Sequence, residues 1–411
     1  MIHAALALAA VAGTPDITLE FLGRTSSGGY DVSAAEVVAY DPATQRAFVV
    51  NALANAVDLV DISVPAAPVR IASISLLPFG GGLQSVAVSN GLVALAVEAT
   101  PKTDPGKVVF MSTSGTIITA VTVGALPDHF CFTPDGTRLV GDAREWGSFT
   151  DGTPVSTLNV VLDPQVFPGQ AWLKGNARLG RLQVRKDLGD LDGDGDYDRL
   201  VAFGARSFSI WNAQGVLVWD SADQLEQLTA ARFPANFNCS NTNNSRDNRS
   251  PQKGPEPEGV TVGVVAGRQF MFGCLERVGG VIAWNIEDPS APVFQDYINP
   301  RDFTQLPFQG NAGDLGSEGL AFVRAENSPN GKPLLLVANE VSGTLSVLQV
   351  NATCSAAGDL DGDCAIDGND LAVLLGSWGS CPAGKACQAD LDGNGVVDGG
   401  DLAQMLGSWG Q

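Results

Sequence analysis

The sequence is poor in histidine and in positive charge. Two histidines occur among 411 residues, and one of them, His3, lies in the first 13 residues. A histidine-rich zinc site or a Ser-His-Asp triad is therefore not expected. Lys and Arg number 24 against 45 Asp and Glu, which gives a net charge of −21. This charge argues against nucleic-acid binding, and it favours cations held by oxygen ligands as partners.

Long apolar runs and several common catalytic motifs are also missing. After residue 13 no run reaches the ~20 apolar residues that a membrane span requires. We find no Walker-type loop, no G-x-S-x-G elbow and no C-x-x-C pair. The first 13 residues, MIHAALALAAVAG, are apolar and end in small residues, which predicts a signal peptide over 1–13 and export. A buried first strand or a wrongly assigned start of the sequence is the alternative for this segment.

The distribution of the cysteines also favours an exported protein. Four crowd the last sixty residues and could form two disulfides in an oxidising compartment. Three more are scattered, so at least one is free or pairs elsewhere. The first group is Cys354, Cys364, Cys381 and Cys387, and the second is Cys131, Cys239 and Cys274.

One pattern recurs along the chain: an acid before a short β-branched run, a turn, and a second apolar run that ends in another acid. In PEPEGVTVGVVAGRQFMFGCLE the two acids are Glu258 and Glu276, and a hairpin would place them on one rim. Repetition of this pair at roughly 40–60 residues predicts a β-propeller over 17–350, with six blades or, if 151–184 contributes one, seven. Residues 17–22, ITLEFL, should complete the last blade.

The first strand of each propeller blade lines the central channel, so we expect these acids to meet at one mouth of it. They could accept backbone N–H bonds, hold a metal ion, or support catalysis at that metal. The candidates are Glu36, Glu98, Asp128, Asp142, Glu258, Glu276, Glu318 and Glu340.

Several cations follow strand ends or lie in the polar insertion 238–254, which we expect to be a solvated loop. They could form salt bridges that hold the blades together, or they could bind a phosphate or sulfate group. These residues are Arg144, Arg206, Arg246, Arg249, Lys253 and Arg277.

The C-terminal region carries two copies of one unit, DLDGDCAIDGNDLAVLLGSWG and DLDGNGVVDGGDLAQMLGSWG, offset by 31 residues. Each places oxygen ligands at positions 1, 3, 5, 7, 9 and 12 of an EF-hand loop, which predicts two Ca²⁺ ions. The ligands are Asp359, Asp361, Asp363, the Ala365 carbonyl, Asp367 and Asp370, then Asp390, Asp392, Asn394, the Val396 carbonyl, Asp398 and Asp401.

A third acidic loop fits only part of this template. It supplies Asp190, Asp192, Asp194, Asp196 and Asp198, but position 12 is Val201. The loop is either a surface calcium site completed by other groups or an acidic turn.

The tandem loop–helix units resemble a dockerin domain over 359–411, preceded by a linker at 351–358. The resemblance implies a small all-α domain that docks into a cohesin-like or cell-surface receptor through the helix after each loop. The residues that would carry this contact are Leu371, Leu374, Leu375, Trp378, Leu402, Met405, Leu406 and Trp409.

The segments AAEVVAYDPATQRAFVVN, LGDLDGDGDYDRLVAFGARSFSIWN, KGPEPEGVTVG and GSEGLAF resemble the choice-of-anchor I domain. That family implies a secreted β-propeller joined to varied anchoring modules, related to mesenchyme surface glycoproteins and to atypical alkaline phosphatases. Between 128 and 179 this chain is shorter than the family pattern. We therefore expect a secreted binding or scaffold protein, with a metal-dependent phosphatase or phosphodiesterase as the alternative.

Overall fold

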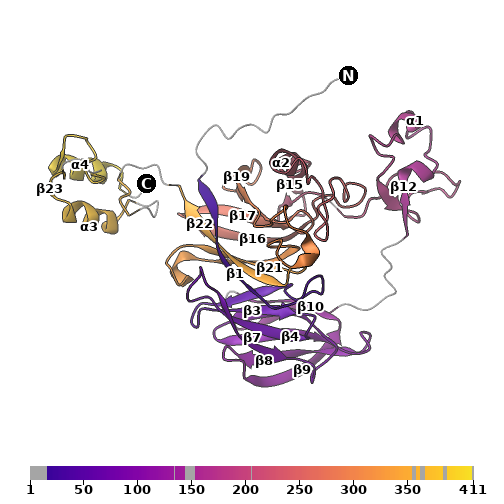
Figure 1. The fold of residues 1–411 in the computed structure, drawn as a ribbon, viewed down its shortest axis with the longest axis horizontal. Coiled ribbons are helices and arrows are strands. Elements are labelled where there is room, and N and C mark those ends of the chain that lie inside the picture. Colours follow the sequence, from indigo (N-terminus) through magenta and orange to yellow (C-terminus); the bar gives the residue numbers. More distant parts are fainter. Residues whose placement is uncertain are drawn as a thin grey trace.

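Four antiparallel sheets of four strands each form the body of the protein (Figure 1). The computed structural model describes residues 16–133, 135–143, 153–204, 206–353, 358–361, 366–382 and 387–409, except for the side chains of 129 and 141–143. Within these ranges, three of the sheets are formed by consecutive strands and the fourth by three consecutive strands plus the first strand of the chain. This is the arrangement of propeller blades.

The sheets follow one another along the chain. The first comprises β2 (Val38–Asp41), β3 (Arg46–Asn51), β4 (Ala56–Asp61) and β5 (Val69–Ser75), and the second β6 (Gly82–Ser89), β7 (Leu92–Glu98), β8 (Pro105–Ser112) and β9 (Ile117–Ala125). The third comprises β16 (Pro257–Val265), β17 (Arg268–Leu275), β18 (Val281–Asn285) and β19 (Val293–Ile298). The last comprises β20 (Ser317–Val323), β21 (Leu334–Asn339), β22 (Thr344–Ala352) and β1 (Ile17–Ser26).

The N-terminal strand β1 closes the last sheet, as its alternating pattern predicted. It runs antiparallel to β22, from Ile17 opposite Ala352 to Ser26 opposite Thr344. The long edge of β22 is thereby covered, which removes the unpaired backbone groups of an open sheet. Figure 1 shows this indigo strand lying against the yellow-orange β22.

Three apolar clusters hold neighbouring sheets face to face. One joins the β16–β19 sheet to the β20–β22–β1 sheet and contains Phe270, Phe272 and Leu348. The next two join β20–β22 to β2–β5, and β2–β5 to β6–β9. The fully buried strand centres, such as the Phe48–Val50 run of β3, supply this packing because both faces of each sheet are covered.

The predicted third and fourth blades are only two-stranded hairpins within the described residues. The first pairs β10 (Pro127–Phe132) with β11 (Leu139–Ala143), and the second pairs β14 (Ser209–Trp211) with β15 (Leu217–Asp220). Segment 153–204 contains the short pair β12 (Pro154–Ser156) and β13 (Gln183–Arg185), the turn η1 (Thr157–Asn159) and helix α1 (Gln170–Leu173), so its described part is not a four-stranded blade.

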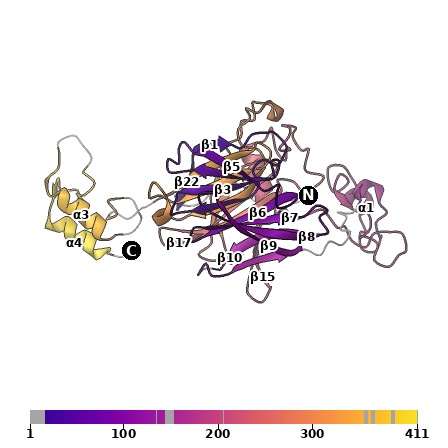
Figure 2. The same cartoon turned by 90° about the horizontal axis from the view of Figure 1, so that it is seen from below.

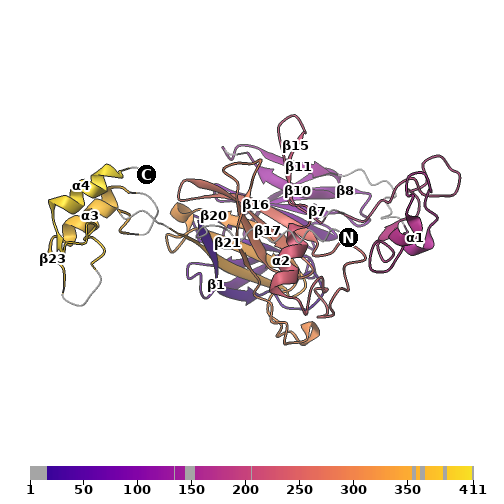
Figure 3. The same ribbon diagram turned by 90° about the horizontal axis from the view of Figure 1, so that it is seen from above.

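Other connections contain short helical elements: α2 (Gln224–Arg232), η2 (Pro307–Gln309) and η3 (Ala325–Asn327). Helix α2 packs beside the β14–β15 hairpin on the β16–β19 sheet. There the rings of Trp219 and Phe208 lie edge-to-face with the buried Trp284 ring, at centroid separations of 6.0 and 5.9 Å. Figure 3 shows α2 beside β17, and Figure 2 shows the strand β15 at the edge of the body.

The C-terminal part is a pair of helices, α3 (Gly368–Gly376) and α4 (Gly399–Gly407), with the small sheet β23 (Gly379–Ser380) and β24 (Val396–Val397). Ile366, Leu374, Val397 and Met405 are fully buried and form its core. In Figure 1 this part is separate from the sheets. None of the helices in the described part of the chain is long and apolar enough to cross a bilayer.

Candidate functional site

The acids predicted at the strand ends meet where β2, β16 and β20 begin. Pro257 lies opposite Leu275, and Ser317 lies opposite Asn339, so each hairpin brings its first and last acid to the same end of the sheet. We call five of these side chains the rim glutamates, because each is linked electrostatically to at least one of the others: Glu36, Glu258, Glu276, Glu318 and Glu340.

Glycines let the backbones of neighbouring first strands approach closely beneath these side chains. A Cβ atom at Gly259 would lie 2.0 Å from the carbonyl oxygen of Glu318, and one at Gly319 would lie 2.3 Å from that of Glu36. The Glu-Gly pairs of β16 and β20 thus have a double purpose. Their glycines bring the sheets together, and their acids are thereby placed on one rim.

Four of the rim glutamates, Glu36, Glu258, Glu276 and Glu318, hold protons more tightly than isolated carboxyl groups do. Burial raises the pKa of Glu318 to about 8, and the charges of Glu340 and Glu36 add to the shift. Burial raises the pKa of Glu276 to about 8 as well, with the charge of Glu256 as the next cause. The pKa of Glu36 rises to about 7, mainly through burial. The gathered carboxylates repel one another unless protons or a cation neutralise them.

Glu256, which the sequence analysis did not single out, lies at the centre of the positive charge beside this rim. It is 2% exposed, and its carboxylate pairs with Lys253, with Arg249 at 3.2 Å and with Arg277 at 2.5 Å. Burial opposes ionisation of Glu256, but its bonds to Arg277 and Lys253 outweigh burial and lower its pKa. Glu256 is therefore an anchor for three cations.

Arg249 and Lys253 belong to the segment 238–254, which the sequence predicted to be a solvated loop. The structure instead folds this segment over the rim. Cys239, Ser240 and Asn241 are buried, and Asn241 donates a hydrogen bond to Glu276 at 2.8 Å. The guanidinium of Arg301 holds the loop by donating to the carbonyl oxygens of Ser240 and Asn243 at 2.9 and 3.1 Å. Arg301 lies 57 or more residues away in sequence, so local composition did not indicate this contact.

Some of the predicted cations lie at the rim and others lie away from it. Arg249, Lys253 and Arg277 form ion pairs at the rim, and Arg277 also bonds Glu276 at 2.6 Å. Arg206 instead pairs with Glu226 of α2 at 2.8 Å, and Arg246 bonds the Pro234 carbonyl and lies over the Phe237 ring. Arg144 lies outside the described residues.

Two other predicted acids lie on the second sheet and on the β10–β11 hairpin. Glu98 ends β7 and pairs with Lys102 at 3.2 Å, and Asp128 lies on β10. The strand register places Glu98 opposite Gly82, at the start of β6, which is the end of the hairpin where the sequence predicted it. The side chain of Asp142 lies outside the described part of the chain.

The rim offers oxygen ligands suited to a hard divalent cation. Carboxylate oxygens of Glu256, Glu258 and Glu276 all lie within 4.8 Å of one another. If all six acids including Glu256 are ionised, the three cations leave an excess of three negative charges. Oxygen ligands and excess negative charge fit Ca²⁺ or Mg²⁺ better than a soft metal.

The acidic loop at 190–198 gains an unexpected neighbour. Asp190, Asp192 and Asp194 bring oxygens within 4.8 Å of one another, and a second group joins Asp196 and Asp198 to Asp163. Asp163 was missed because it precedes the loop by 27 residues; the bridge between Leu162 and Tyr197 brings it there. The carboxylate of Asp198 accepts the Leu191 N–H at 2.7 Å and so helps to close the loop.

The two C-terminal loops share one hydrogen-bond pattern. Asp370 accepts N–H bonds from Leu360, Asp361 and Asp367 at 2.6, 3.1 and 2.8 Å. Asp401 accepts the equivalent bonds from Leu391, Asp392 and Asp398 at the same three distances. These bonds, with that from Asp398 foremost, lower the pKa of Asp401, so that it remains an anion.

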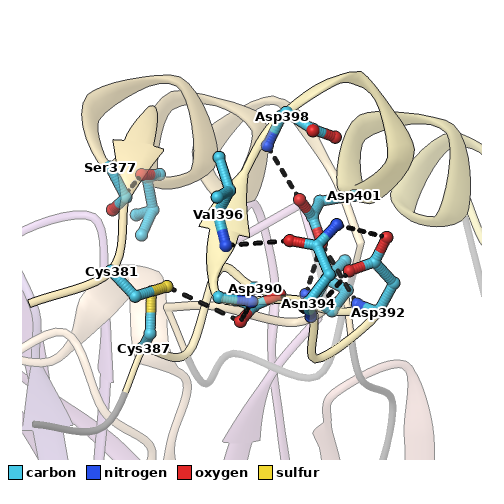
Figure 4. The surroundings of a disulfide bond; sticks show 12 residues. Ser377, Cys381, Cys387, Asp390, Asp392, Asn394, Val396, Asp398 and Asp401 are labelled. Atoms are coloured by element: carbon cyan, nitrogen blue, oxygen red, sulfur yellow. Dashed lines mark hydrogen bonds between the residues drawn. A yellow bond between two sulfur atoms is a disulfide. The ribbon is translucent and has the colours of Figure 1, made fainter. Parts of the chain in front are cut away.

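The oxygen set of these loops fits calcium. In the first loop, Asp359, Asp361 and Asp370 have carboxylate oxygens within 4.8 Å of one another, while Asp363 and Ala365 lie outside the described residues. In the second, Gly395 at position 6 has φ of +87°, the left-handed turn for which glycine is expected there. Figure 4 shows Asp390, Asp392, Asn394 and Asp401 facing one another around this loop.

The residues predicted to contact a partner do not all lie on the surface. Leu374 and Met405 are fully buried in the core between α3 and α4, and Leu371 and Leu402 pack against it, so these four stabilise the fold. The exposed members repeat in the two units, a leucine within each helix and a tryptophan just after its end. They are Leu375 (52%), Trp378 (50%), Leu406 (52%) and Trp409 (43%).

Of the seven cysteines, Cys381 and Cys387 form a disulfide within the C-terminal part. Cys239 and Cys274 are free and buried, and Cys131 is free and exposed. Cys354 and Cys364 lie outside the described residues.

Comparison with known proteins gives consistent relatives. The family profile of the choice-of-anchor I domain matches residues 36–140 and 141–289. Gigasin-3a from Magallana gigas is 29% identical over 190 residues, 43% of this chain and 66% of that protein. The mesenchyme-specific cell surface glycoprotein of Strongylocentrotus purpuratus is 28% identical over 114 residues, 24% of this chain and 15% of that protein. The chain thus spans less than two thirds of the length of these curated relatives.

Among solved structures, the PQQ-bound aldose sugar dehydrogenase from Streptomyces coelicolor is 11% identical, with 82% of this chain and all of that chain covered and a TM-score of 0.38. A likeness at this level carries no argument about activity.

Proposed function

Because this chain belongs to the choice-of-anchor I domain family, we propose that it is a secreted or cell-surface β-propeller that binds a partner and is held in place by a calcium-loaded C-terminal domain. The name of the sea-urchin relative, a cell surface glycoprotein, supports the location. We propose residues 1–13 as its signal peptide, 17–350 as the propeller, 351–358 as the linker and 359–411 as a dockerin-like domain. In the propeller, the hairpins β10–β11 and β14–β15 would complete a count of six blades.

The observation that supports this anchor best is the matched geometry of the two C-terminal loops. Position 12 of each loop accepts N–H bonds from positions 2, 3 and 9 at equal distances. A loop drawn together in this way turns its alternate oxygens inward, as calcium coordination needs. Each loop then leads into a helix with an exposed leucine, and an exposed tryptophan follows its end, so that both are available to a receptor. A cohesin-like or cell-surface receptor is the partner class that we propose.

Limited proteolysis of the full chain tests the anchor. We expect calcium to slow cleavage within 359–409 relative to a sample in EGTA. The variant Asp361→Asn/Asp392→Asn changes position 3 of both loops without touching the helix caps, and it should lose this protection. Equal cleavage of the parent chain with calcium and with EGTA would exclude a calcium-dependent anchor.

A second candidate function follows from the rim: a metal-dependent phosphatase or phosphodiesterase. The specific support is the gathering of the rim glutamates beside the cations Arg249, Lys253 and Arg277. A bound divalent ion would polarise a phosphoryl oxygen and lower the pKa of water. The glutamates would hold that ion, with Glu258 as the most exposed described ligand. Arg277 is shared between Glu256 and Glu276, which reduces the charge that it can offer to a phosphate.

Phosphate release from an aryl phosphate monoester and from a diester, with added calcium, distinguishes the two candidates. Activity that is lost in Glu258→Gln and Glu318→Gln, but retained in the surface variant Glu326→Gln, would favour the enzyme. A chain that binds calcium at the rim and releases no phosphate would favour the binding protein.

A further inference from the structure

The disulfide between Cys381 and Cys387 lies directly beside the second calcium loop (Figure 4). It closes a six-residue separation between the end of the β23 segment and the residues that lead into Asp390. Both cysteines are partly buried against the core of the C-terminal domain. The bond therefore joins the segment after α3 to the beginning of the next loop.

The segment that ends in Cys381, one side of the disulfide, is hydrogen bonded to the middle of the loop. In the β23–β24 pair, Gly379 lies opposite Val397 and Ser380 lies opposite Val396. The N–H of Cys381 continues the pairing by donating to the Gly395 carbonyl at 3.0 Å. Val396 is position 7, the residue whose carbonyl oxygen an EF-hand-type loop turns toward the ion. The segment that ends in Cys381 thus fixes the backbone on both sides of the Val396 carbonyl.

Cys387, the other side of the disulfide, fixes Asp390, which is position 1 of the loop. The N–H of Asp390 donates to the Cys387 carbonyl at 3.2 Å, and a carboxylate oxygen of Asp390 lies 3.6 Å from the Cys381 sulfur, a contact in which the disulfide sulfur has no hydrogen to donate. The same carboxylate accepts N–H bonds from Asn394 and Gly395 at 3.0 and 2.8 Å. Asp390 is thereby held from both the cystine side and the loop side.

We propose that the Cys381–Cys387 disulfide positions two calcium ligands of the second loop, the Asp390 carboxylate and the Val396 carbonyl, before the ion arrives. Without the bond, β23 and Cys381 are free to separate from β24, and calcium binding must then order them again. This ordering weakens the second site, while the first site, which is formed by a different loop, is unaffected. The proposal rests on the proposed calcium-binding function of the C-terminal domain.

Calorimetric titration of the full chain with Ca²⁺ tests the proposal. The variant Asp361→Asn leaves the second loop as the intact C-terminal site, and Asp392→Asn leaves the first. Cys381→Ser/Cys387→Ser is then combined with each of them. Asp361→Asn/Asp392→Asn measures the calcium taken up by the rest of the chain, so that this contribution can be subtracted.

Loss of the disulfide should weaken calcium binding about tenfold in the Asp361→Asn background, a fraction of the ordering entropy that a short cross-link removes. It should leave the affinity in the Asp392→Asn background unchanged. Helix content of the calcium-saturated chain, measured by circular dichroism, should also be unchanged, which separates positioning of ligands from collapse of the domain.

Equal affinities with and without the disulfide in the Asp361→Asn background would overturn the proposal while leaving the anchor intact. Equal losses at both loops would overturn it too, because they would show a general structural role. If neither single-loop variant binds calcium beyond the doubly substituted control, the proposed function itself fails, and the inference fails with it.

Discussion

Replacement of Glu318 by glutamine tests the electrostatics of the rim. Glu318 is the second residue of β20. Its Oε2 atom is buried without a hydrogen-bond partner in the described structure. Glutamine keeps the size of the side chain and removes its charge. Because the pKa of Glu318 rises from 4.5 to about 8, the folded state binds the proton more tightly than the unfolded chain does. The stability of the parent protein should therefore fall as the pH rises from about 4.5 through about 8.

The size of the effect follows from that pKa. At about 1.4 kcal/mol for each pH unit, ionising Glu318 in the folded state costs at most about 5 kcal/mol. Solvent reaches part of this side chain and screens the charge, so we expect about 2 kcal/mol in practice. In a chelator at pH 9, Glu318→Gln should be more stable than the parent by this amount. At pH 5, where the parent carboxyl is protonated in the fold, the difference should nearly vanish.

Urea unfolding at pH 5, 7 and 9 measures the difference, with Glu326→Gln as a control because Glu326 is exposed and lies outside the rim. Calcium should reverse the order at pH 9, since the parent retains a ligand that the variant lacks. A Glu318→Gln protein that is less stable than the parent in chelator at pH 9, or a difference that does not change with pH, would refute this electrostatic reasoning.

Three further predictions concern the construction of the rim. Gly259→Ala should destabilise the protein by about 3 kcal/mol, because its Cβ would meet the Glu318 carbonyl at 2.0 Å, whereas Gly169→Ala, with no atom within 4 Å, should have little effect in the same thermal melt. Arg277→Gln should cost about 3 kcal/mol by leaving the buried Glu256 carboxylate with fewer cations, and the loss should shrink at low pH, where Glu256 is protonated. A chain without residues 16–26 should expose the edge of β22 and form aggregates by light scattering, and an unchanged monomer would contradict the role of β1 as the closing strand.

Local patterns in the sequence were enough to predict the hairpins that build the rim. Alternation in 17–22 indicated a strand without a partner nearby, and ring closure supplied that partner in β22. The acids at the start of each first strand and after each second strand indicated that Glu258 lies beside Glu276. The two-residue period of the strands and the antiparallel turn leave little freedom in the register of the hairpin. The duplicated C-terminal units were equally readable, since their spacing reflects one loop geometry.

What the sequence did not reveal depends on contacts between distant residues. The polar composition of 238–254 indicates a solvated loop, yet the buried Arg301 satisfies its carbonyl groups and folds it over Glu276. Glu256 reads as one more acid in a short acidic run, and only its burial among Arg249, Lys253 and Arg277 shows its separate role. Leu374 and Leu375 are neighbours of one type, and only the packing of α3 against α4 distinguishes the buried from the exposed one.

Calcium titration of the Asp361→Asn/Asp392→Asn chain, in two buffers of different ionisation heat, tests most directly whether the rim glutamates act as one coupled site. At about pH 7.5 Glu276 and Glu318 are largely protonated in the cation-free rim, so calcium should bind and displace protons into the buffer. Glu318→Gln should lower both the affinity and the number of protons released. Absence of calcium uptake, or uptake without proton release, would contradict a carboxylate site built from these strands.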